Sequence, residues 1–255
     1  MIPANRHQII LERIEKLGSV RTIDIAEQLG VTDETIRRDF EKLERENHLQ
    51  RTHGGAISTQ QFNIKDRSFE ERSIQNIEAK RRIATQAEKL IQPGDRIFID
   101  ASSTSLQLAA TISNTPNLTV ITNSALVIGE LTAHKDIDLI LTGGILDRQS
   151  QSYTGPATIA TLRRYRIDKA FFSGNGIDEI RGVSEVNEAQ AHIKDFVIPR
   201  SGNVIFLADP TKFGTSSTYF FAQCDQIDTI VTSKEASHPL LDSLEEKGMQ
   251  IIYAD

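Results

Sequence analysis

The sequence of 255 residues contains a single cysteine, Cys224. One thiol excludes an internal disulfide framework and any zinc site built from several cysteines. No other cysteine or histidine stands at ligand spacing from Cys224, so we expect an ordinary, partly buried thiol. The sequence therefore predicts neither a metal site nor a bound cofactor.

Long apolar runs are also missing. No segment approaches the roughly 18 apolar residues that a membrane-spanning helix needs, and residues 1–7 lack the apolar stretch of a secretory signal. Hydrophobic residues make up 38% of the chain and charged residues 25%, which is the balance of a globular protein. We therefore expect a cytoplasmic protein without a membrane partner.

The chain lacks an excess of positive charge. Its formal net charge is −6, and residues 1–56 contain nine Lys/Arg against ten Asp/Glu. This argues against a structural nucleoid protein, because such proteins bind DNA through excess positive charge. Any DNA binding must come from the local placement of a few arginines.

Apolar spacing predicts three helices near the N-terminus. The first covers residues 6–17, with Ile10 and Ile14 on its buried face. The second begins after Thr22, its expected N-cap, and ends at Gly30. Each of these helices presents one apolar stripe, as a small helical core requires.

A third helix follows a tight turn of three residues. Its expected N-cap is Thr32, and it covers residues 33–46. A helix, a short turn with glycine and a second helix are typical of a helix-turn-helix. Two extended runs on either side of Gly54-Gly55 then predict a β-hairpin, so the N-terminal domain is interpreted as a winged helix-turn-helix.

The exposed face of the third helix is the expected DNA reader. Ile36, Phe40 and Leu43 cluster on the buried side of a helical wheel. Pairs such as Glu34–Arg38 would also suit a merely solvated face, but the preceding helix and turn favour DNA, with Asp39 paired locally to an arginine. The predicted DNA-binding residues are Thr35, Arg37, Arg38, Lys42, Arg51, His53, Gly54 and Gly55.

Residues 58–77 are polar and are interpreted as a linker that becomes helical near residues 69–72, which leaves domains at 1–57 and 78–255. From residue 78 onward, apolar runs alternate with helical stretches. The expected strands lie at 96–100, 118–122, 137–141, 169–172, 204–208 and 229–231. This order predicts an α/β fold with a mostly parallel sheet covered on both faces.

Polar and glycine residues follow the strands of this sheet, where ligands of such folds bind. Residues 100–104 combine hydroxyls with an expected helix start and predict a phosphate site, although one serine there could simply cap the helix. Gly143-Gly144 could be an ordinary turn, and Asp209 with Lys212 a surface ion pair. The candidates are Asp100, Ser102, Ser103, Thr104, Thr122, Asn123, Gly143, Gly144, Gly174, Asn175, Asp209 and Lys212.

Over its whole length the chain resembles the DeoR family of bacterial sugar-metabolism repressors. The matching motifs are Arg6 with Ile10 and Ile14, Thr35-Ile36-Arg37-Arg38-Asp39-Phe40, His53-Gly54-Gly55-Ala56, D-x-S-S-T at 100–104, Asn187-Glu188-Ala189 and D-P-T-K-F-G at 209–214. The resemblance implies a sensor domain with the fold of ribose-5-phosphate isomerase, and it adds Glu188 to the effector-binding candidates. Lys194 stands where members vary, and it is given no role.

These observations predict a non-enzymatic regulator of transcription. It would bind operator DNA, would have a phosphorylated sugar or sugar derivative as its effector, and would repress a sugar-catabolism operon as a homodimer or homotetramer. The alternative is a sugar-phosphate isomerase with an accessory DNA-binding domain, for which Asp100, Glu185, Glu188 or Asp209 would be the base. The fused winged helix favours the regulator.

Overall fold

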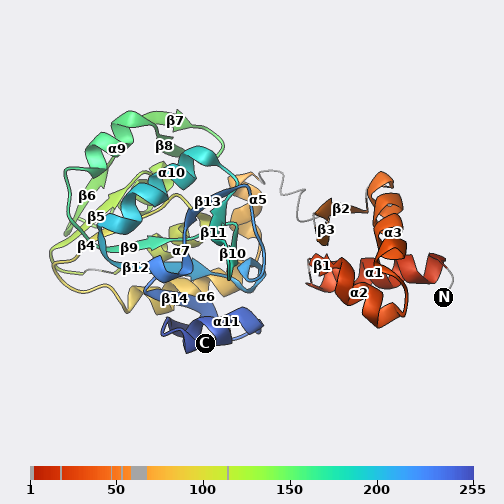
Figure 1. The fold of residues 1–255 in the computed structure, drawn as a ribbon. Helices are drawn as coiled ribbons and strands as arrows, with labels where there is room; N and C mark the ends of the chain where they lie inside the picture. The colour runs from red at the N-terminus through yellow and green to blue at the C-terminus, as the bar shows by residue number, and fades with distance from the viewer. Residues whose placement is uncertain (1–2, 18, 47, 53, 59–67, 114) are drawn as a thin grey trace. The chain divides into compact units, whose positions relative to one another are not determined.

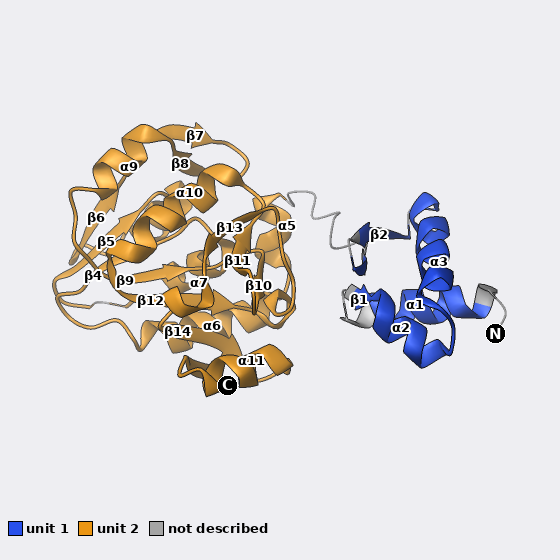
Figure 2. Ribbon diagram, viewed as in Figure 1, with its two compact units in different colours: residues 1–65 blue, residues 66–255 orange. Residues whose placement is uncertain are grey.

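The computed structural model describes residues 3–17, 19–46, 48–52, 54–58, 68–113 and 115–255. The chain forms two compact units, residues 1–65 and 66–255 (Figure 2). The sequence interpretation placed residues 58–77 in a linker. Helix α5 (Phe69–Ile74), which falls in that range, belongs to the second unit and contacts its helix α7 (Ser103–Thr111).

The first unit is a winged helix (Figure 1). Its elements are α1 (Pro3–Leu17), β1 (Ser19–Arg21), α2 (Thr22–Leu29), α3 (Asp33–Arg45), β2 (Leu49–Thr52) and β3 (Gly55–Ser58). The strands pair antiparallel in the order β1-β3-β2. Strand β1 was not predicted, because three residues between two helices give no alternating pattern. The core contains Ile10, Ile14, Ile25, Ile36, Phe40 and Leu43.

Local sequence explains the turn between α2 and α3. Gly30 ends α2 in the left-handed conformation with φ 62°, which glycine adopts without steric cost. Thr32 caps α3, since its hydroxyl oxygen accepts a hydrogen bond from the Thr35 N–H at 3.3 Å. The prediction for Thr22 was wrong: Thr22 is the first helical residue, and the N-cap position is Arg21.

The second unit is built on a seven-stranded parallel sheet with the order β15-β14-β12-β9-β4-β5-β6. In chain order these strands are β4 (Arg96–Ile99), β5 (Leu118–Thr122), β6 (Ile137–Leu141), β9 (Ile167–Phe172), β12 (Ser201–Ala208), β14 (Thr229–Ser233) and β15 (Gln250–Ala254). All six predicted strands are confirmed. Strand β15, an edge strand beside β14, was missed.

Helices cover both faces of this sheet, as the sequence predicted. One face packs against α6 (Ile77–Glu88), α7 and α8 (Ala125–Leu131), where Ile97 and Ile99 meet Ile83 and Leu108. The other face, on which the intervening Phe98 lies, packs against α9 (Pro156–Leu162) and α10 (Glu188–Val197). Alternation along β4 therefore supplies two separate cores.

Smaller elements complete the unit. They are the antiparallel sheet β10 (Gly176–Asp178), β11 (Gly182–Glu185) and β13 (Tyr219–Ala222), the hairpin β7 (Ile145–Asp147) and β8 (Ser152–Thr154), helix α11 (Pro239–Glu246), and the short 3-10 helices Ile198–Arg200, Pro210–Lys212 and Cys224–Gln226. Among the described residues, no helix has the length and apolar character to cross a membrane. Cys224 is half-buried, and burial raises the pKa of its thiol to about 11.

Candidate functional site

The exposed face of α3 presents the cationic side chains that the helical wheel predicted. Arg37, Arg38 and Lys42 are exposed, whereas Thr35 is half-buried. Arg38 Nε lies 3.2 Å from Glu34 Oε1, and 76% of the Arg38 side chain remains accessible. An exposed pair of this kind contributes little stability, so the guanidinium can exchange its partner for DNA at small cost.

Asp39 is buried beneath this face. It does pair with an arginine, but with Arg6 of α1 rather than with a neighbour on α3. Arg6 Nη2 donates to Asp39 Oδ1 at 3.0 Å, and His7 Nε2 lies 2.9 Å from the same oxygen. Burial alone would raise the pKa of Asp39, but the hydrogen bonds from Arg6 and His7 outweigh it and lower that pKa. Asp39 therefore fastens α3 to α1.

The wing holds its arginine beside α3. Arg51 Nη1 lies 2.7 Å from Glu41 Oε1, and the Arg51 N–H donates to Glu44 Oε1 at 2.8 Å. Gly54 is exposed, but Gly55 is buried, and a Cβ there would lie 1.9 Å from the Val20 oxygen. The missing side chain of Gly55 thus allows the close contact with β1, and the DNA contact predicted for Gly55 stays a prediction. His53 lies outside the described residues.

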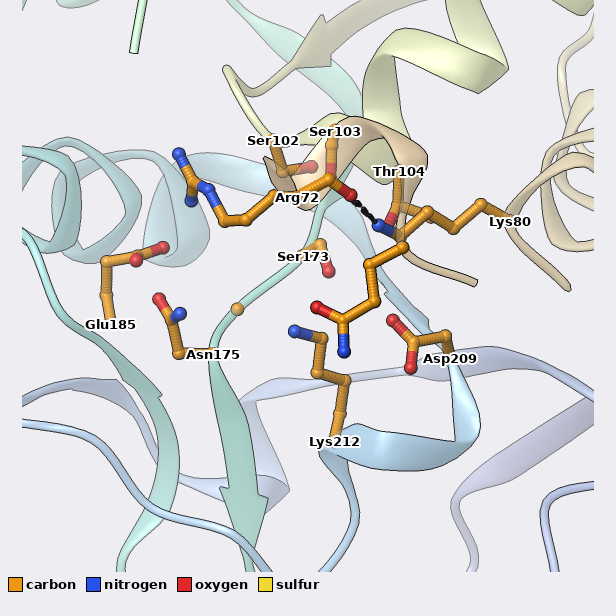
Figure 3. Close-up of a pocket in the computed structure, with 12 residues that line it drawn as sticks. Arg72, Lys80, Ser102, Ser103, Thr104, Ser173, Asn175, Glu185, Asp209 and Lys212 are labelled. Carbon is orange, nitrogen blue, oxygen red and sulfur yellow. Dashed lines mark hydrogen bonds between the residues drawn. The ribbon is translucent and has the colours of Figure 1, made fainter. Parts of the chain in front are cut away.

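In the second unit, a pocket lies beyond the carboxyl ends of the neighbouring strands β12, β9 and β4 (Figure 3). Seven predicted effector residues line it: Ser102, Ser103, Thr104, Gly174, Asn175, Asp209 and Lys212. The space free of protein atoms is about 390 Å³, including the part open to solvent. Topology explains this convergence, since the segments that follow adjacent parallel strands meet at one edge.

The pocket contains the start of α7. Ser102 is its N-cap, with the Ser102 hydroxyl oxygen accepting from the Ser105 N–H at 3.1 Å. The two explanations considered for this serine are therefore compatible, because the cap also lines the pocket. The first turn of a helix offers free backbone N–H groups and a positive dipole end, which suit an anion.

Three cations, Arg72, Lys80 and Lys212, line the same pocket. Lys80 Nζ donates to Ser103 Oγ at 3.1 Å and to the Arg72 carbonyl oxygen. Burial lowers the pKa of Lys80 to about 8, and it lowers the pKa of Lys212 as well, against the attraction of Asp209. An anion in the pocket would relieve the cost of keeping these ammonium groups charged.

A buried ion cluster supports the pocket wall. Lys194 Nζ lies 2.5 Å from Glu185 Oε2 and 3.1 Å from Asp100 Oδ2, and it donates to the Ser173 carbonyl oxygen at 2.7 Å. Burial alone would lower the pKa of Lys194, but the two carboxylates raise it. Asp100 accepts from the N–H groups of Ser102 and Ser173, so it orders the walls and does not line the cavity.

Five other predicted effector residues also lie outside the pocket lining. Thr122 donates to the Ile99 carbonyl oxygen, and Asn123 donates to the Tyr153 carbonyl oxygen and to the side-chain oxygen of Gln190. Gly143 and Gly144 form the tight turn after β6, with φ 66° and 126°. The fifth, Glu188, is exposed on α10.

Four lining residues that sequence reasoning gave no role are Arg72, Gln75, Lys80 and Ser173. Lys80 did leave a signal, since it stands three residues before Ile83 and seven before Ala87, on the buried face of α6. Lys194 has the same kind of position on α10, among Gln190, Ala191 and Val197. A lysine within an apolar stripe is unusual unless it has a buried partner.

The winged helix with its exposed arginines, together with the second α/β unit, places the chain in the class of DNA-binding proteins that carry an additional domain. Family models narrow this class. A DeoR-like helix-turn-helix domain matches residues 6–62, and a DeoR C-terminal sensor domain matches residues 75–234. The chain therefore belongs to the DeoR family of transcriptional regulators, and the sensor match covers the region that the isomerase alternative required.

Individual relatives agree with this assignment. The chain is 38% identical over 251 residues to an uncharacterized HTH-type transcriptional regulator, YulB, of Bacillus subtilis, covering 98% of this chain and 96% of the relative. It is 34% identical to the L-fucose operon activator of Haemophilus influenzae, covering 90% and 91%. Among solved structures, ribose 5-phosphate isomerase A of Methanocaldococcus jannaschii is 17% identical with a TM-score of 0.41, covering 54% and 55% of the chains.

Proposed function

We propose that this regulator is a repressor that binds operator DNA through α3 and the wing. A phosphorylated sugar or sugar derivative, bound in the pocket, would release the DNA. The supporting observation is that Arg72, Lys80 and Lys212 converge on the start of α7. A phosphate dianion needs hydrogen-bond donors and positive potential, and this pocket offers both.

The remaining lining favours a hydroxylated carbon skeleton beside the phosphate. Asn175 and Asp209 both line the pocket, and side chains of these types bind hydroxyl groups as donors and acceptors. The protein would act in the cytoplasm as a homodimer or homotetramer held together mainly by residues 78–255, because repeated or palindromic operators are read by symmetric oligomers.

Release requires the effector to favour a conformation that binds DNA less well. A coupling free energy of about 1–3 kcal/mol would weaken operator binding by about 5–150-fold. Reciprocity then requires operator DNA to weaken effector binding by the same factor. The polar segment between the two units is the covalent path for this coupling.

The decisive experiment titrates the full-length protein with inorganic phosphate, ribose 5-phosphate and hexose 6-phosphates by calorimetry, and measures operator binding by fluorescence anisotropy. Lys212→Ala and Ser103→Ala should keep operator affinity and lose the response to the sugar phosphate. Lys247→Ala is the matched control, because Lys247 is exposed and paired with Glu179. If both pocket variants respond at the wild-type concentration, the effector site lies elsewhere.

Two further measurements separate this proposal from its alternatives. Transcription in vitro from a template with a selected operator should fall when the protein is added and recover with the sugar phosphate. Stimulation by the protein alone would replace repression with activation. Turnover of ribose 5-phosphate at an enzyme-like rate would instead favour the isomerase.

A further inference from the structure

Two shallow grooves lie next to each other on the second unit, and none of their lining residues lines the proposed effector pocket. The first, the basic groove, encloses about 1010 Å³, including space open to solvent, and is lined by Pro156, Ile159, Ala160, Arg163, Arg164 and His192. The second, the acidic groove, encloses about 820 Å³ on the same measure and is lined by Glu188, Ala189, His192, Asp195, Tyr219 and Phe220. His192 belongs to both grooves, so they form one continuous face.

The elements beneath this face are packed together. Helix α10 contacts both α9 and β13 (Figure 1). The arginines at the end of α9 line the basic groove, and the aromatic residues of β13 line the acidic groove. The face therefore rests on ordered elements and can present a fixed shape to a partner.

Apolar surface and unpaired charge occur together here. Ile145 is 68% exposed. It lies beside the basic groove, because its Cδ1 would be 3.2 Å from a Cβ on Gly155, a residue that lines this groove. Arg164, Glu188 and Asp195 are exposed. Within the ranges that the structure describes, none of these three residues forms a salt bridge in this chain. Exposed apolar patches rimmed by unpaired charge are typical of protein interfaces.

We propose that this face binds a second copy of the chain across a two-fold axis that passes close to His192. A two-fold interface uses the same surface on both subunits, so every contact from one groove to the other occurs twice. The basic groove of one copy then meets the acidic groove of its partner, and the reverse contact forms by symmetry. Arg163 and Arg164 line the groove on one side of His192, and Glu188 and Asp195 line the groove on the other, which is the arrangement that such an axis needs.

Charge reversal on the full-length chain tests this geometry. In a symmetric dimer, either substitution alone, Arg164→Glu or Asp195→Lys, turns both of the opposite-charge contacts between the grooves into like-charge contacts. Each variant alone should weaken self-association by about tenfold or more, since like charges brought together at an interface are costly. Sedimentation velocity would show a wild-type dimer becoming a monomer, or a tetramer becoming a dimer.

Mixing the two variants gives the sharper result. In the mixed pair, the Arg164→Glu site of one copy faces the Asp195→Lys site of the other, and the two unchanged residues, Asp195 and Arg164, also face each other. Both contacts then join opposite charges. Native mass spectrometry of an equimolar mixture should therefore show the heterodimer in excess over either homodimer. Recovery on mixing also shows that each variant is folded.

Matched control substitutions lie on the other face of the sheet. Arg81 on α6 and Glu130 on α8 are exposed, so Arg81→Glu and Glu130→Lys should leave self-association unchanged. The proposal is overturned if Arg164→Glu and Asp195→Lys associate as the wild type does, if mixing restores nothing, or if the wild type is monomeric at micromolar concentration. This inference rests on the homo-oligomer of the proposed function: a monomeric wild type would contradict both, whereas charge-reversal variants that associate as the wild type does would contradict this face alone.

Discussion

The two units handle positive charge in opposite ways. In the DNA-binding unit, Arg38 is 76% exposed and its partner Glu34 is 67% exposed. In the second unit, Lys194 is 3% exposed and lies between two buried carboxylates. Exposed pairs exchange partners at little cost and suit a long polyanion, whereas buried pairs are fixed and can hold a pocket in one shape.

The largest effect should come from breaking the buried cluster. Lys194→Met leaves Asp100 and Glu185 without their cation, and an uncompensated buried charge costs about 3–5 kcal/mol. Urea unfolding of the full chain, followed by hydrogen exchange in the central strands, should show this loss in the second unit. Lys247→Met, which breaks the exposed pair with Glu179, should leave the unfolding transition nearly unchanged. Equal losses in the two variants would remove the contrast between buried and exposed pairs.

The next largest effect should come from Asp39, the buried carboxylate of the DNA-binding unit. Asp39→Asn weakens the hydrogen bonds from Arg6 and His7, each worth roughly 1.5–3 kcal/mol when one partner is charged. The folded pKa of Asp39 is lowered, so its contribution is complete above the unfolded pKa of about 3.9 and is lost as the pH falls through the folded pKa.

Hydrogen exchange of α1 and α3 at a series of pH values measures this effect. Wild-type protection should stay level from about pH 7 to 5 and decline below about pH 4, and the Asp39→Asn variant should show a smaller decline. A wild-type decline that begins well above pH 5 would contradict the assignment of this effect to Asp39.

The third effect concerns operator affinity. Arg38→Ala should weaken operator binding by about 1–3 kcal/mol, yet it should hardly change the stability of the first unit, because the pair with Glu34 is exposed. Anisotropy titrations across a salt series and thermal unfolding measure the two quantities. Unchanged operator affinity would mean that another face of α3 meets the DNA.

The same contrast explains how much of the site could be predicted. Residues 102–104, Asp209 and Lys212 stand directly after strands, and the rules of parallel sheets bring such segments together. Arg72 and Lys80 belong to helices whose positions depend on tertiary packing, which local sequence does not specify. Asn187 is the N-cap of α10. Glu188 therefore begins an exposed helical turn and lies outside the pocket.

Buried polar residues at the same sheet edge have structural partners. Thr122 and Asn123 are polar and follow a strand, as the sequence reasoning required, but their side chains hydrogen-bond to neighbouring segments. Polar groups at such an edge can hold the loops together or meet a ligand, and residue type alone does not separate the two roles.

The smallest expected effect is a difference between the two units in how ligand binding depends on pH. Burial lowers the pKa of Lys80 to about 8, so above this pH Lys80 must take up a proton before it can bind a phosphate as a cation. Affinity for the sugar phosphate should then fall by up to about tenfold per pH unit above about pH 8. Below about pH 6 the phosphate itself becomes a monoanion, which leaves the tightest binding between these limits. Operator binding by Arg37 and Arg38 should not follow this profile, since guanidinium groups stay charged throughout.

Calorimetry from about pH 6.5 to about pH 9.5 measures the profile. The variant Lys80→Arg keeps the charge and should flatten the decline, whether or not its affinity at neutral pH is reduced. A decline that persists in Lys80→Arg would assign the proton to Lys212, whose pKa is also lowered by burial. A wild-type affinity that stays level up to the highest pH would mean that neither buried ammonium contacts the phosphate. The contrast between exchangeable surface cations and buried pocket cations would then fail at its central point.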